Sequence, residues 1–166
     1  MKEELPQFLV GGDTVVESTY NSYTPEESPA KYEAGLQDYA AIVGAGAAID
    51  FINKSKAGKH EVVLNTLCTE LLKEELDSGK IILLGPRDAK LRSGIFNFYV
   101  PGKDHHEIAL LLDEAYSIAV RAGAHCVHSW YHAKEIPGSV RASFYLHNTE
   151  DDVRAFVTAL KEVLML

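Results

Sequence analysis

Arg121-Ala122-Gly123-Ala124-His125-Cys126 is the stretch around which this chain is organised, and Val140-Arg141-Ala142-Ser143-Phe144-Tyr145 follows it at a distance. The first run places a thiol beside a histidine, after a glycine turn and near an arginine. The thiolate is the nucleophilic form of cysteine, whose free pKa is about 8.5, so a nearby positive charge or base favours its chemistry. The second run holds an arginine among residues typical of a strand, and an arginine fork can bind a carboxylate through two hydrogen bonds. Together they predict a site that attacks or carries sulfur beside a bound carboxylate, although a buried cysteine and a surface arginine would account for the same letters.

The composition is that of one globular domain. The chain has 166 residues, of which 46% are hydrophobic, and a chain of this length buries about 70% of its unfolded surface. Its net charge of −8 disfavours a nucleic-acid partner. No run approaches the roughly 18 apolar residues of a membrane span, and no apolar leader follows the first residues. With only Cys68 and Cys126, the chain has no disulfide framework, so we expect a cytoplasmic protein.

The N-terminal part of the chain is expected to be extended at first and then helical. Residues 14–16 and 18–20 have the composition of short strands, and residues 21–29 are rich in turn formers. A helix dominated by small residues is predicted over 37–53. Its Gly44 and Gly46 each cost about 1 kcal/mol relative to alanine, which close packing against another element would justify.

The remaining elements alternate between helices and short strands. A helix is predicted over 59–77, with Cys68 as a small core residue, and strands over 80–84, 94–100 and 140–146. Asp104 is predicted to cap the next helix, with Glu107 completing a capping box. Asn148 or Thr149 is predicted to cap the last helix, whose apolar face consists of Val153, Phe156, Val157, Leu160, Val163 and Leu164. The order predicts an α+β fold, a small and largely antiparallel sheet with helices packed on it.

Several of these motifs, taken together, resemble the C-terminal part of SufS-type cysteine desulfurases. These enzymes belong to the class V aminotransferase family, which uses pyridoxal phosphate (PLP). The resemblance rests on residues 121–126, on Arg141-Ala-Ser-Phe-Tyr and on Asn148-Thr149-Glu150, and it extends through residues 32–49 to a glycine-rich turn at 8–12. It implies that residues 1–30 form an arm belonging to the family's large domain and dimer contacts, and that residues 31–166 form the C-terminal small domain. It also implies a break near residues 116–117 followed by a strand at 118–120, where periodicity alone would continue the helix to Arg121.

The resemblance also implies roles for individual residues. Cys126 matches the cysteine that takes sulfur from free cysteine as a persulfide, after PLP has labilised the bond to sulfur, and Arg141 matches the receptor of the substrate carboxylate. Arg121 and His125 flank the nucleophile and are expected to favour its thiolate. Gly35 matches the start of a cofactor-contacting segment, but Leu36-Gln37-Asp38 follows it where many members have Thr-Pro-Asn.

The cofactor itself is expected to be bound elsewhere. The family's Schiff-base lysine follows a histidine in a large N-terminal domain, and this sequence contains no His-Lys pair. We therefore expect no PLP on this chain alone, and a PLP-binding domain or subunit, a second copy and a sulfur-acceptor protein as partners. A metal site built from His125, Cys126, His128 and His132 is not expected, because their spacing matches no standard finger.

Three functions remain open on the sequence. The first is the C-terminal domain or split subunit of a cysteine desulfurase, inactive without the domain that carries the PLP lysine. The second is a non-catalytic interaction or dimerisation module. The third is a stand-alone carrier that holds a persulfide on Cys126.

Overall fold

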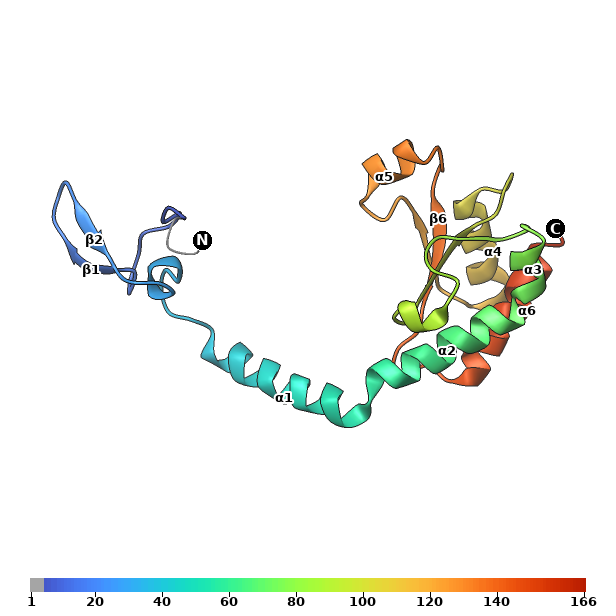
Figure 1. The fold of residues 1–166 in the computed structure, drawn as a ribbon, viewed down its shortest axis with the longest axis horizontal. Helices are drawn as coiled ribbons and strands as arrows, with labels where there is room; N and C mark the ends of the chain where they lie inside the picture. Colours follow the sequence, from blue (N-terminus) through green and yellow to red (C-terminus); the bar gives the residue numbers. More distant parts are fainter. Residues whose placement is uncertain (1–4) are drawn as a thin grey trace. The chain divides into compact units, whose positions relative to one another are not determined.

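The computed structural model describes residues 5–166, which form two compact units. The first unit ends at Phe51 and the second spans Ile52–Leu166 (Figure 1). The start of the predicted arm, residues 1–4, lies outside the described residues. The assignment of residues 1–30 to a large domain and of residues 31–166 to a small one stays a prediction.

A small hairpin forms the centre of the first unit. Strands β1 (Val15–Ser18) and β2 (Tyr23–Pro25) pair antiparallel, and a 3₁₀ turn, η2 (Ala30–Tyr32), follows. Of the extended segment expected at 14–16, residues 15 and 16 lie in β1, whereas of the one expected at 18–20 only Ser18 does. Thr19 begins the connecting turn instead, because its backbone N–H donates to the carbonyl of Ser22 at 2.8 Å and its hydroxyl also contacts the Ser22 side chain.

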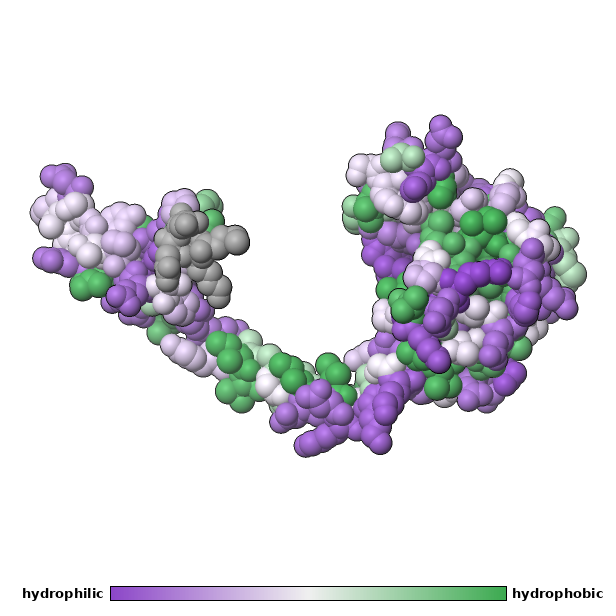
Figure 2. Space-filling model, viewed as in Figure 1, coloured by the Kyte–Doolittle hydropathy of each residue, from purple (hydrophilic) through white to green (hydrophobic). Residues whose placement is uncertain are grey.

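The helix α1 (Tyr39–Ser55) confirms the helix predicted over 37–53, with both ends two residues later. None of its residues is buried, and a Cβ added to Gly44 or Gly46 would have nothing within 4 Å. Within residues 5–166, therefore, no other element packs closely against these glycines. Hydrophobic side chains stand out along this helix in Figure 2. The exposed large hydrophobic residues of α1 are Tyr39, Ile42, Val43, Ile49, Phe51 and Ile52.

The second unit is built on a four-stranded antiparallel sheet in the order β3-β4-β6-β5. Its strands are β3 (Ile82–Leu83), β4 (Ile95–Tyr99), β5 (Arg121–Gly123) and β6 (Ser139–Ser143). Because β4 and β5 both run antiparallel to the β6 strand between them, they are parallel to each other, and the helix α4 (His105–Tyr116) connects them. The predicted α+β fold is confirmed.

Alternation along the strands separates a core face from an outer face. Phe96 and Phe98 of β4 and Val140 and Ala142 of β6 are buried on one side of the sheet. The residues between them in sequence therefore point to the other side, and these are mainly polar. The outer face, and not the core, is where the sheet can carry a site.

Helices cover the core face. They are α2 (Ala57–Leu71), α3 (Lys73–Asp77), α4 and α6 (Glu150–Val163), and a 3₁₀ turn, η3 (Ala89–Leu91), precedes β4 (Figure 1). The predicted apolar face of α6 is confirmed, since its members join one cluster with the core residues of the sheet. Cys68 of α2 is fully buried in the same cluster, as expected.

The expected helix ends are largely confirmed. The carboxylate of Asp104 accepts from the backbone N–H groups of His106 and Glu107, at 2.7 and 3.0 Å, and these bonds lower its pKa. Thr149, and not Asn148, caps α6 in a capping box with Asp152.

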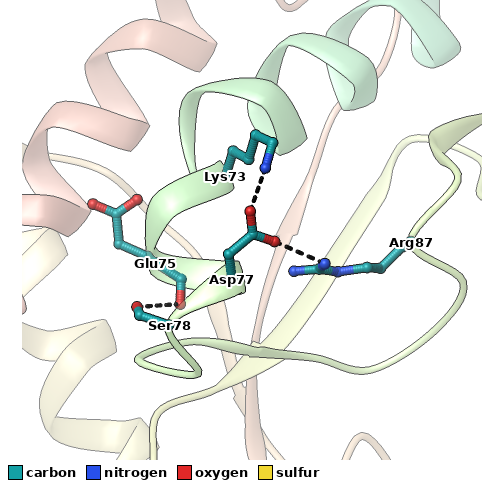
Figure 3. A network of polar contacts seen from close by, with 5 residues as sticks. All are labelled: Lys73, Glu75, Asp77, Ser78 and Arg87. Atoms are coloured by element: carbon teal, nitrogen blue, oxygen red, sulfur yellow. Dashed lines mark hydrogen bonds and ion pairs between the residues drawn. The ribbon is translucent and has the colours of Figure 1, made fainter.

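The single helix predicted over 59–77 is wrong in one respect. It is interrupted at the fully buried Leu72, so that α2 and α3 are separate helices. Figure 3 shows how the end of α3 is fixed. The carboxylate of Asp77 accepts from Lys73 and, at 2.8 Å, from Arg87, and both hydrogen bonds lower the pKa of Asp77.

The strand expected at 118–120 is also wrong. The helix does end at Tyr116, as predicted, and Ile118 and Val120 pack against the core, but ladder pairing begins only at Arg121. A hollow of about 250 Å³ lies between residues 117–120 and the end of β6. The β-branched residues here serve packing and not strand pairing.

Among residues 5–166, no helix has the length and apolar character needed to cross a membrane.

Candidate functional site

A tight turn carries Cys126. The backbone N–H of Val127 donates to the carbonyl of Ala124 at 2.8 Å, and the two residues between them, His125 and Cys126, have φ of 50° and 63°. Positive φ at both central positions is the pattern of a type I′ turn, which normally contains Gly, Asn or Asp. Each such conformation in a non-glycine residue costs about 1 kcal/mol or more, and strain of this kind clusters at functional sites.

The sheet register places two arginines side by side near this turn. Arg141 in β6 lies directly opposite Arg121 in β5 and opposite Asn97 in β4, so the three side chains share the outer face. Like charges directly opposite each other destabilise a sheet. Among the described residues neither arginine forms an ion pair, and Nε of Arg141 is buried without a partner. Such a pair of guanidinium groups is suited to bind an anion such as a carboxylate.

The two cysteines lie in opposite environments. Cys126 is exposed, and Nη2 of Arg121 lies 3.7 Å from its Sγ. The guanidinium of Arg121 therefore places a positive charge beside this sulfur. Cys68 is fully buried, and burial raises the pKa of its thiol far above the usual value. Cys126 is therefore the accessible thiol of the chain.

A buried set of hydrogen bonds lies beneath the turn. We call Asn97, Tyr131 and Ser139 the Ser139 network, because Oγ of Ser139 contacts Oδ1 of Asn97 at 2.7 Å and the hydroxyl of Tyr131 at 2.5 Å. Nε2 of His125 joins the same oxygen at 2.9 Å. Tyr131 comes from a short helix, α5 (His128–Ala133), that directly follows the turn and returns to the outer face. The network thus connects the turn to both central strands.

The environment of His125 disfavours its charged form. Burial lowers its pKa most, followed by the positive charges of Arg141 and then Arg121. The neutral ring therefore persists to lower pH than that of a free histidine, whose pKa is about 6.5. A neutral ring brings no charge to Cys126, whereas the guanidinium of Arg121 lies beside its sulfur.

A hollow of about 470 Å³ opens next to these groups on the outer face. Arg141, His125 and Asn97 contribute its polar side chains, and Trp130 and Val127 form part of its apolar wall. Its other lining residues are Leu84, Gly85, Ile95 and Tyr131. The hollow has room for a small molecule, and the guanidinium of Arg141 in its lining can bind an anion.

The structure brings together four of the five predicted site residues. Cys126, His125, Arg121 and Arg141 share the outer face, whereas Gly35 belongs to the first unit, where its N–H donates to the carbonyl of Gly12 at 2.9 Å. The Ser139 network was not predicted. The sequence pattern that could have indicated it is the alternation of polar with apolar residues along the two strands, with polar residues at 97, 139 and 141.

The donor groups present do not fit PLP or a metal. The cofactor needs a lysine for its Schiff base and an acidic group near its pyridine nitrogen, and the hollow is lined by neither. His128 and His132 line a different hollow, which Tyr131 also borders. Within residues 5–166, no three His, Cys, Asp or Glu side chains are placed to hold a metal ion together.

Comparison with known proteins identifies the family. Residues 1–156 match the family described as aminotransferase class-V. A probable cysteine desulfurase of Streptomyces coelicolor is 35% identical over 161 residues, which are 97% of this chain and 38% of that protein. A probable cysteine desulfurase of Pyrococcus abyssi is 33% identical over 94% of this chain and 38% of its own length. The chain therefore belongs to the class V aminotransferase family, and it spans well under half the length of these relatives.

Solved structures agree with the sequence matches. The apo cysteine desulfurase of Thermococcus onnurineus NA1 superposes with a TM-score of 0.82 at 31% identity, over 96% of this chain and 39% of that one. The cysteine desulfurase CsdA of Escherichia coli gives a TM-score of 0.77 at 30% identity, over 95% and 38%. These coverages are consistent with the predicted relationship to the C-terminal part of a cysteine desulfurase.

Proposed function

We propose that this chain is the part of a cysteine desulfurase that binds the substrate carboxylate and receives the sulfur. One observation carries the proposal: an exposed thiol in contact with a guanidinium lies on the same sheet face as a second arginine, whose buried Nε has no hydrogen-bond partner within residues 5–166. Names of relatives alone would not identify these residues. The geometry supports Cys126 as nucleophile, Arg121 as the cation beside it and Arg141 as the carboxylate receptor.

The overall chemistry balances with these groups. The carbon–sulfur bond of free cysteine breaks, a sulfur–sulfur bond forms at Sγ of Cys126, and alanine leaves with the proton that replaces sulfur on carbon. Arg141 holds the carboxylate through the whole exchange and so orients the sulfur toward the thiolate. Arg121 stabilises the negative charge on sulfur before and after transfer.

The remaining part of the enzyme is the expected partner. Because the hollow contains no lysine, the PLP that the family's mechanism requires is expected to be held by that part. The exposed apolar side chains of α1 support a large contact of this kind, since isolated helices do not normally leave such residues in water (Figure 2). A second copy of the chain, a sulfur-acceptor protein and a cytoplasmic location complete the proposal.

Arg141→Gln tests the carboxylate assignment in the complex with a PLP-loaded N-terminal portion of a desulfurase. Loss of a charged hydrogen-bond pair is worth about 1.5–3 kcal/mol, so KM for cysteine should rise about 10- to 100-fold, measured by alanine release. Arg154→Gln is the matched control, because Arg154 is a surface residue of α6 that pairs with Glu150 and lies outside the hollow. An unchanged KM in Arg141→Gln would contradict the assignment.

A further inference from the structure

The hydrogen bonds around Ser139 determine which groups donate. Its side chain is fully buried, and a hydroxyl carries one proton and accepts two hydrogen bonds. Oδ1 of Asn97 can only accept, so the Ser139 proton goes to it. Oγ of Ser139 must then accept from both other neighbours, the Tyr131 hydroxyl and Nε2 of His125. Asn97 completes the set, since its Nδ2 donates to the Tyr131 oxygen at 3.4 Å.

The second ring nitrogen of His125 supports the same protonation state. Nδ1 is buried and has no hydrogen-bond partner among the described residues. A proton on Nδ1 would be an unpaired buried donor, which is costly. After burial, the facing charges of Arg141 on β6, Arg121 on β5 and His105 on α4 all lower the pKa of His125, and a hydrogen bond to the backbone of Ser139 acts in the opposite direction. The ring of Tyr131, from α5, also faces His125, with 6.2 Å between the two ring centroids.

We propose that His125 is a positioning residue whose Nε2–H donor, bonded to the Ser139 network, fixes the turn that carries Cys126. The inference rests on the proposed role of Cys126 as the sulfur-accepting thiol. Two consecutive residues with positive φ need an external anchor, because the conformation is locally unfavourable. The anchored turn places Sγ of Cys126 at 3.7 Å from Arg121. His125 therefore acts through geometry, and neither takes a proton from the thiol nor supplies charge to it.

Substitutions of the ring separate this role from a base or a charge. His125→Gln keeps an N–H donor near the position of Nε2 but has no titrating group, whereas His125→Ala has neither. The readout is the rate at which iodoacetamide alkylates Cys126 at neutral pH in the full chain, followed by peptide mapping. His125→Gln should stay within about twofold of the unsubstituted chain, while His125→Ala and Ser139→Ala should each be about 2- to 10-fold slower, the worth of one hydrogen bond.

The double variant and the pH profile sharpen the test. Because both residues act through one bond, His125→Ala combined with Ser139→Ala should be no slower than either single variant. The pH profile of His125→Gln should have the shape of the unsubstituted profile. Equal slowing in His125→Gln and His125→Ala would show that the histidine ring acts as a base or through its charge, and would overturn the proposal. An unchanged alkylation rate in Ser139→Ala would overturn it as well.

A measurement on the unsubstituted chain does not depend on whether a variant folds. In ¹⁵N-histidine-labelled protein at neutral pH, Nε2 of His125 should give a protonated, pyrrole-type resonance and Nδ1 an unprotonated, pyridine-type one. The opposite assignment, or a doubly protonated ring, would overturn the proposal. Neither this measurement nor alkylation needs PLP or substrate, so a Cys126 that never receives sulfur would refute the proposed function and leave the positioning role standing.

Discussion

Brief alkylation of the native chain should modify Cys126 and spare Cys68. The perturbation is exposure to iodoacetamide without denaturant, and the two thiols are internal references for each other. Cys126 is exposed on its turn, whereas Cys68 has no exposed surface and lies within the cluster formed by α2, α6 and the sheet.

The expected difference in alkylation rate follows from the free energy needed to unfold the surroundings of Cys68. Cys68 can react only when its surroundings unfold, and a domain is stable by at least about 5 kcal/mol. Since about 1.4 kcal/mol corresponds to a factor of ten, Cys68 should react more than about 10³-fold more slowly than an open thiol. The raised pKa of Cys68 acts in the same direction, because burial disfavours its thiolate.

The assay is a time course of alkylation read by peptide mass spectrometry. The control repeats it in concentrated urea, where both cysteines should react at similar rates. Equal native rates, or faster modification of Cys68, would show that the cluster around α2 is open or that Cys126 is covered, and the site described above would then be wrong.

Three further predictions concern the scaffold of the second unit. Leu160→Ala should lower the free energy of unfolding by about 2–5 kcal/mol, because Leu160 is fully buried on α6. Urea unfolding measures the loss, with Thr158→Ala at an exposed position of the same helix as the control. A loss below about 1 kcal/mol would mean that α6 does not pack against the core. Gly94→Ala should cost about 1–3 kcal/mol or more, because its Cβ would lie 1.8 Å from the carbonyl oxygen of Phe144; a thermal midpoint equal to that of the unsubstituted chain would contradict this contact. Asp104→Asn should make the free energy of unfolding less dependent on pH in the acidic range. The pKa of the Asp104 carboxyl is lowered on folding, so its contribution is present above its unfolded pKa of about 4 and is lost as the pH falls through the folded value. Equal losses of stability between neutral and acidic pH in the two proteins would refute this.

The parts of the fold that the sequence predicted are those determined locally. The apolar stripe of α6 and the caps at Asp104 and Thr149 depend on residues a few positions apart, so helical spacing and capping chemistry were enough. The strand expected at 118–120 failed for the opposite reason. Whether Ile118 and Val120 pair or only pack depends on the path of β6, which is set by contacts far along the chain.

In the candidate site, too, the features set by neighbouring residues could be predicted and those set by distant contacts could not. The adjacency of Cys126 to His125, and the nearness of Arg121, could be read directly from the sequence. That Arg141 lies opposite Arg121 depends on the sheet register, and that Tyr131 reaches Ser139 depends on α5, a helix of six residues with no clear periodic signal. The proposed tautomer of His125 could be inferred only from the three hydrogen bonds at Oγ of Ser139. Their partners are Asn97 on β4, Tyr131 on α5 and His125 in the turn.

Sulfur transfer to Cys126 is the most direct test of the proposed function. The chain is combined with a PLP-loaded N-terminal portion of a desulfurase and with cysteine, trapped with an alkylating agent without reductant, and mapped by mass spectrometry. One extra sulfur atom on Cys126, none on Cys68, and no transfer in Cys126→Ser with an unchanged unfolding midpoint is the predicted result. Active desulfuration that leaves Cys126 unmodified, or that persists in Cys126→Ser, would contradict it.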